Sequence, residues 1–103
     1  MAKEIILYNL ADHVTDEEYK EYVMKEKGPL LDSLSSVKKF ELVKVAGSTS
    51  VECPYQYAGI MHITSVEEFS QKDAPSQAFQ DFMNKWQSMV KDVTMLAGDE
   101  VYG

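Results

Sequence analysis

The sequence lacks most features that would point directly to a function. It has one cysteine, Cys53, so no disulfide can form within the chain and no thiolate metal cluster can be built. No apolar run reaches the ~20 residues that cross a bilayer, and there is no glycine-rich phosphate loop, nucleotide-binding motif, linker or repeat. We therefore expect one domain over residues 1–103, with no metal site.

Positive charge is also scarce. Ten Lys and Arg residues stand against seventeen Asp and Glu, and the formal net charge is −7. Nucleic acids and anionic membrane surfaces attract proteins mainly through positive charge, so we expect neither as a partner. The chain runs from Met1-Ala2-Lys3-Glu4 straight into an apolar segment without the pattern of a signal sequence. The expected location is the cytoplasm.

The most informative segment that the chain does have is residues 55–64, which is apolar on both sides of a strand. Successive side chains of a strand point to opposite faces. A strand with one face in water would alternate apolar and polar residues. Here the two faces carry Tyr57, Gly59, Met61 and Ile63 on one side and Ala58, Ile60 and His62 on the other. This pattern predicts a strand that is covered on both faces.

Three further strands are expected, at residues 4–10, 37–46 and 92–97. The strand at 37–46 mixes apolar and charged residues on both sides, which favours a place at the sheet edge. A capping box at Thr15–Glu18 predicts a helix start, and Gly28-Pro29 is expected to end that helix. The apolar residues that follow would then fill one end of the core from a loop; they are Leu30, Leu31 and Leu34.

A second capping box, Ser65–Glu68, predicts a short helix, and Pro75-Ser76 precedes a longer one. That longer helix has a wide apolar stripe, made of Phe79, Phe82, Met83, Trp86, Met89 and Val90. Trp86 is interpreted as a core residue rather than a site residue. The order is therefore strand, helix, strand, strand, helix pair, strand, which predicts a ferredoxin-like α+β domain with an antiparallel sheet.

In this topology both helical regions cover the same face of the sheet, and the other face is left exposed. An exposed apolar patch of several hundred Å² usually marks an interface. We therefore expect a homodimer whose two sheets pair into a dimeric α/β barrel. The ligand cavity is expected between the two protomers.

The chain also resembles a known family. The resemblance is carried by residues 5–10, the acidic box 15–19 and the segment from Tyr55 to Phe79, with 64–69 as its best single match. These residues are similar to the RedY-like proteins of the dimeric α/β-barrel superfamily, which are encoded in prodiginine (prodigiosin-type) and related pyrrole or indole pigment and antibiotic pathways. The resemblance implies a small homodimer without a cofactor that handles a reactive biosynthetic intermediate. Relatives carry a His and acidic residues where this chain has Gln56 and Gly59.

Few residues are candidates for chemistry. His62 could act as a general acid or base in a dry barrel; the alternative is a buried histidine satisfied by a partner. Tyr8, Asn9 and Tyr57 could bind a polar edge of the substrate, although strand tyrosines often serve packing instead. Tyr8 and Asn9 point to opposite faces, so only one of them can line the cavity.

Two weaker candidates complete the set. Glu41 could be a cavity carboxylate paired with His62, but a solvated edge residue is the favoured interpretation. Cys53 has no sequence neighbour that would activate its thiol. The methionines, including Met61, Met83 and Met95, would suit a flat aromatic or pyrrolic ligand, and core filling explains them equally well.

Three functions stay open at this point. The first is an accessory enzyme, a cofactor-free cyclase or condensation-assisting enzyme, that directs proton transfer, cyclisation or condensation of a pyrrolic or indolic intermediate. The second is a cofactor-independent monooxygenase of the same fold. The third is a noncatalytic protein that binds the intermediate and delivers it to other pathway enzymes.

Overall fold

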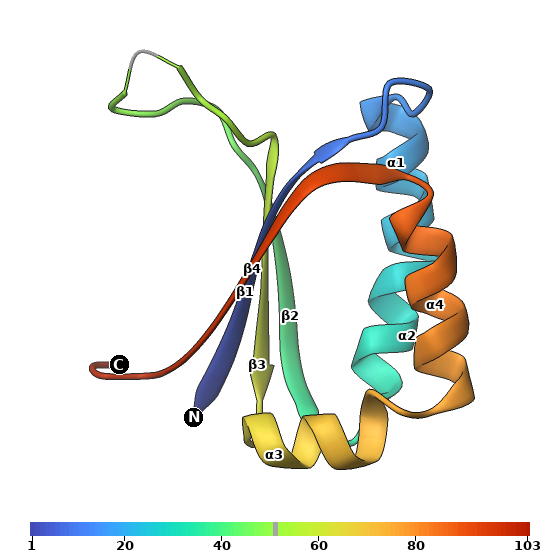
Figure 1. Cartoon of the computed structure of the whole chain (residues 1–103), viewed down its shortest axis with the longest axis vertical. Helices are drawn as coiled ribbons and strands as arrows, with labels where there is room; N and C mark the ends of the chain where they lie inside the picture. The colour runs from blue at the N-terminus through green and yellow to red at the C-terminus, as the bar shows by residue number, and fades with distance from the viewer. Residues whose placement is uncertain (51) are drawn as a thin grey trace.

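The computed structural model describes residues 1–50 and 52–103 and shows one four-stranded antiparallel sheet. Its strands are β1 (Ala2–Leu10), β2 (Val37–Lys44), β3 (Tyr57–Ile63) and β4 (Val90–Asp99), in the spatial order β2-β3-β1-β4 (Figure 1). Each neighbouring pair is antiparallel. The predicted ferredoxin-like α+β fold is confirmed, and β2 lies at an edge as its mixed pattern indicates.

The helices lie together on one side of this sheet. Helices α1 (Asp16–Tyr22), α2 (Gly28–Ser33) and α4 (Gln77–Gln87) cover one face, while α3 (Val66–Glu68) lies at the end of the sheet (Figure 1). The starts of α1, α3 and α4 follow the sequence signals, because in each of these three a hydroxyl oxygen accepts a backbone N–H. The pairs are Thr15 with Glu18 at 3.1 Å, Ser65 with Glu68 at 3.0 Å and Ser76 with Phe79 at 3.2 Å.

The predicted helix end at Gly28-Pro29 is wrong. Helix α1 continues through the five-residue π-helical turn η1 (Val23–Lys27) into α2. The N–H of Gly28 donates to the carbonyl of Val23, and Pro29 falls in the first positions of α2, where an α-helix does not use the missing N–H. The expected loop is therefore helical, and Leu31 is buried from α2. A second π-helical turn, η2 (Phe69–Asp73), likewise extends α3.

Strand register divides the side chains between two faces. Across β1 and β3, Ile6 is opposite Gly59 and Tyr8 is opposite Tyr57, and these residues share the helix-covered face. The other face, here called the open face, has no element over it among the described residues (Figure 1). It carries Ile5, Leu7, Ala58, Ile60, His62 and Leu96. Ile5 and Leu96 are 37% and 51% exposed, so this chain presents apolar side chains to solvent there.

No helix in the described part of the chain has the length and apolar character required to cross a bilayer.

Candidate functional site

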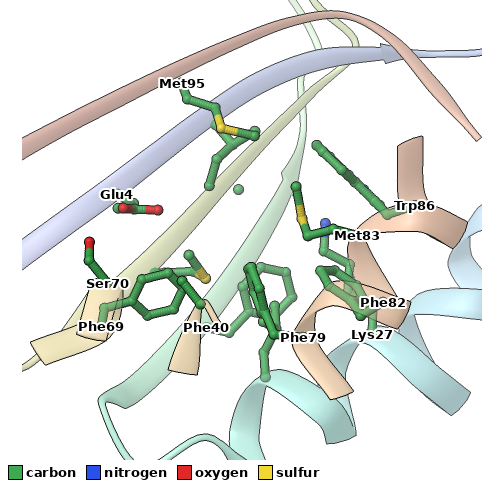
Figure 2. Close-up of a pocket in the computed structure, with 15 residues that line it drawn as sticks. Glu4, Lys27, Phe40, Phe69, Ser70, Phe79, Phe82, Met83, Trp86 and Met95 are labelled. Atoms are coloured by element: carbon green, nitrogen blue, oxygen red, sulfur yellow. The ribbon is translucent and has the colours of Figure 1, made fainter. Parts of the chain in front are cut away.

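A cavity of about 270 Å³ lies between the sheet and the helices of a single chain (Figure 2). We call it the helix-side cavity. Most of its lining side chains are aromatic or contain sulfur. They come from the four strands on one side and from α4 and the π-helical turns on the other. The main lining residues are Phe40, Phe69, Phe79, Phe82, Met83 and Trp86. Such a lining suits a flat apolar molecule.

The helix-side cavity lies on the face opposite to the expected chamber between protomers. Gly59 lines it from the middle of β3 and contributes no side chain to fill it. Gly59 lies between Ile6 of β1 and Leu42 of β2, and a Cβ added there would meet only ordinary contacts at 3.7 Å or more. A chamber between protomers stays a prediction.

Three lining residues are polar: Lys27, Glu4 and Ser70. Lys27 enters from η1 beside Phe82 and Met83, whereas Glu4 and Ser70 lie at the other side of the cavity near Phe69 (Figure 2). Burial raises the pKa of the Glu4 carboxyl above its usual value. A bound molecule would therefore meet a carboxyl group at one end and an amine at the other.

Lys27 is the most unusual of these groups, because it is only 5% exposed and none of the acidic residues that the structure describes forms an ion pair with it. Its Nζ donates to the hydroxyl of Tyr19 at 3.1 Å and lies 3.4 Å from the hydroxyl of Tyr8. It is also 4.9 Å from the ring centre of Trp86 and 5.2 Å from that of Phe40. Burial without a carboxylate lowers the pKa of this amine to about 7.

The tyrosines behind Lys27 form a hydrogen-bonded group. The hydroxyls of Tyr8 and Tyr19 are 2.5 Å apart, and Trp86 donates from Nε1 to the Tyr19 hydroxyl at 2.9 Å. Burial raises the pKa of both phenols above the ordinary tyrosine value. Both hydroxyls therefore stay protonated, and each can donate and accept hydrogen bonds next to the Lys27 amine.

The predicted binding residues separate by face. Tyr8 lies beside Lys27, and Tyr57 stacks on Tyr8 with ring centres 5.7 Å apart. The Tyr57 hydroxyl turns toward α1 and donates to Asp16 at 2.6 Å. Asn9 lies on the opposite side of β1, where its amide donates to the carbonyl of Pro54 at 2.8 Å. Of the three, only Tyr8 contacts a polar group of the helix-side cavity.

His62 lies on the open face, away from the helix-side cavity. Its Nε2 is 2.6 Å from Oε1 of Glu41 on the neighbouring strand, and the side chains are 19% and 42% exposed. The hydrogen bond from His62, together with Lys39, lowers the pKa of the Glu41 carboxyl. Glu41 therefore does pair with His62, which was the less favoured of the two interpretations of Glu41.

Sequence reasoning missed Lys27 entirely. A signal was available, since Tyr19, Val23 and Lys27 follow one another at four-residue spacing and so lie on one side of a helix. It was overlooked because lysine is usually exposed and because the helix was expected to stop at the next residue. The continuous π-helical turn keeps Lys27 on the side that faces the sheet.

Comparison with known proteins places the chain among established relatives. The family model described as "REDY-like protein HapK" matches residues 2–101. The crystal structure of HapK from Hahella chejuensis is similar at a TM-score of 0.83, with 22% identity over 100% of this chain and 95% of that one. No curated protein sequence matches the chain.

Other solved structures share the fold alone. The Arabidopsis thaliana protein At3g17210 is similar at a TM-score of 0.85 and 17% identity, over 100% of this chain and 98% of that chain. A dimeric ferredoxin-like protein from Thermobifida fusca is similar at 0.75 and 14%, over 96% and 90%. With the family model covering nearly every residue, we conclude that the chain belongs to the REDY-like HapK family.

Proposed function

We propose that this protein binds a flat, mainly apolar biosynthetic intermediate in the helix-side cavity and directs its proton transfer, cyclisation or condensation without a cofactor. The observation that carries the proposal is an aromatic and methionine-lined cavity of about 270 Å³ with only three polar groups. An apolar cavity of about 150 Å³ is enough for benzene, so this one suits a bicyclic aromatic molecule. Family membership favours a pyrrolic or indolic intermediate of a prodiginine-type pathway.

Binding can be tested with a panel of bicyclic pyrroles and indoles. Trp86 is the only tryptophan of the chain and lines the cavity, so its fluorescence reports on occupancy. We expect saturable quenching by flat aromatic compounds and none by sugars or nucleotides of similar mass. Calorimetry on the same compounds gives the stoichiometry, expected to be one ligand per chain. Absence of saturable binding by every aromatic compound would contradict the proposal.

A homodimer through the open face is part of the same proposal. Exposed apolar side chains such as these usually mark an interface, and the Thermobifida fusca neighbour is described as dimeric. Ile5→Asp would place a carboxylate between Ile60 and Leu96, its partners on the adjacent strands. We expect this variant to sediment as a folded monomer, while the parent chain sediments as a dimer. A parent chain that is monomeric at micromolar concentration would refute the dimer.

His62 stays a candidate for proton transfer, now on the open face with Glu41. We expect His62→Gln to keep aromatic ligand binding within about twofold, because the residue lies on the other side of β3 from the cavity. Its effect on pathway flux decides between two roles. Loss of product with binding intact would assign His62 a part in the chemistry, whereas unchanged product would leave the chemistry, if any, to the helix-side cavity.

A further inference from the structure

The amine of Lys27 is chemically unlike every other lysine amine in the described chain. Surface lysines such as Lys85 and Lys91 pair with carboxylates, at 2.7 Å and 2.5 Å. Around Lys27, the described residues within bonding range supply two phenol oxygens and aromatic rings, with no carboxylate. A cationic form would lose its hydration there with no carboxylate to neutralise it. The amine is therefore held in an environment that favours its neutral, nucleophilic form.

The polar neighbours of this amine are two phenol hydroxyls. A neutral lysine amine has two N–H bonds and one lone pair. The hydroxyls of Tyr19 and Tyr8 lie where they can accept these two N–H bonds, at 3.1 Å and 3.4 Å. Among the described residues, only these two phenols lie within hydrogen-bond range of Nζ, and Lys27 lines the helix-side cavity (Figure 2). A carbonyl group brought into the cavity could take the hydrogen bond of a phenol on its oxygen and meet the lone pair with its carbon.

We infer that Lys27 forms an imine with an aldehyde or ketone group of a flat aromatic ligand bound in the helix-side cavity. The inference rests on the proposed function and adds the reactive class of the ligand. The amine lone pair attacks the carbonyl carbon to give a carbinolamine, and one amine proton passes to the oxygen. Loss of water then leaves the C=N bond, so aldehyde and amine give imine and water with no oxidant or reductant consumed.

The neighbouring groups fit the proton movements of this step. The hydroxyls of Tyr8 and Tyr19, 2.5 Å apart, can carry a proton from nitrogen to the departing oxygen. A flat ligand that fills the apolar lining would keep water, which hydrolyses imines, away from the C=N bond. A protonated imine makes its carbon more electrophilic toward an electron-rich ring. A ring carbon that attacks there forms the new C–C bond and loses its proton. Cleavage of the C–N bond, with loss of a second proton from the ring system to the leaving nitrogen, then forms the new double bond and returns the free amine, so the net by-product is the water already released.

The test uses two naphthalene probes of the same shape on the intact protein. Incubation with 1-naphthaldehyde and sodium cyanoborohydride near neutral pH reduces any imine to a stable secondary amine. Its mass increment is that of the aldehyde less its oxygen atom. The chain has ten lysines and no arginine, so peptide mapping compares ten lysine amines and the amine of Met1. We expect Lys27 to be modified at least tenfold faster than any other lysine.

A reaction pH near 7.5 favours modification of Lys27 over the surface lysines. At this pH more than half of an amine with a pKa of about 7 is neutral. Only about one in a thousand amines with the ordinary lysine pKa is neutral at the same pH. Lys27→Met should remove the fast adduct. If that variant fails to fold, 1-methylnaphthalene serves instead, since it occupies the cavity without reacting. It should protect Lys27 in the parent protein and leave surface lysines untouched.

The outcomes separate the two proposals. Adducts spread over surface lysines, with Lys27 no faster than the rest, would overturn the imine while methylnaphthalene binding by calorimetry kept the proposed function intact. Failure of methylnaphthalene and of every other aromatic compound in the panel to bind would overturn the proposed function itself. Fast, protectable modification of Lys27 supports both.

Discussion

Lys27→Met is expected to make the protein more stable at neutral pH, although it removes a polar side chain with hydrogen bonds. The folded-state pKa of Lys27, about 7, is depressed from 10.5 by burial. Between these values the unfolded chain binds a proton that the folded chain does not, so the parent's free energy of unfolding rises with pH. At about 1.4 kcal/mol per pH unit, the rise from pH 7 to 9 is roughly 2–3 kcal/mol.

The Met variant should lack this rise, since it has no proton to bind at this position. Its advantage over the parent is therefore largest at or below pH 7 and shrinks as the pH increases toward 9. Urea denaturation at several pH values measures both slopes. Lys85→Met, on an exposed pair with Glu26, is the matched control and should change stability by less than ~1 kcal/mol with the parent's pH slope. Parallel pH profiles for the parent and Lys27→Met would contradict a buried, depressed amine.

Gly59→Leu should abolish aromatic ligand binding, with a loss of at least tenfold in affinity. Gly59 lines the helix-side cavity, and a Cβ there is accommodated without a clash. The remaining carbons of leucine would extend into space that the ligand needs, while their burial compensates the fold. A tenfold loss corresponds to about 1.4 kcal/mol. Calorimetry with 1-methylnaphthalene measures it.

The neighbouring position provides the control. Ala58 is one residue away on the same strand and faces the open side. Ala58→Leu adds three carbons to that face, so it should leave ligand affinity within about twofold and alter only the dimer equilibrium. A reversed result, with Ala58→Leu blocking the ligand and Gly59→Leu having no effect, would move the binding site to the open face.

The fold was predictable because its signals are local. Short segments that are apolar on both faces, 4–10 and 55–64, located the two central strands, and the Thr15, Ser65 and Ser76 caps marked helix starts. The continuation of the helix past Gly28-Pro29 was not predictable. The N–H of Gly28 bonds to the carbonyl of Val23, five residues back, and this π-helical turn places Pro29 in the first turn of α2, where proline is tolerated. Short-range rules carry no information about that turn.

The site was harder to predict than the fold. A strand that is apolar on both faces does not indicate which face borders a cavity, and Gly59 was interpreted only as one more apolar position. Tyr8 was named as a candidate for substrate binding without its face being assigned, and its surroundings depend on Lys27, which lies 19 positions away and contacts it only in the folded chain. His62 was singled out for its chemistry and lies on the opposite face.

A crystal structure of the protein with a bicyclic aromatic ligand bound tests the central claim most directly. We predict ligand density in each chain between the sheet and α4, stacked near Trp86 and Phe40, with one edge at Lys27. Density against His62 and Glu41 on the open face, with the helix-side cavity empty, would contradict the account.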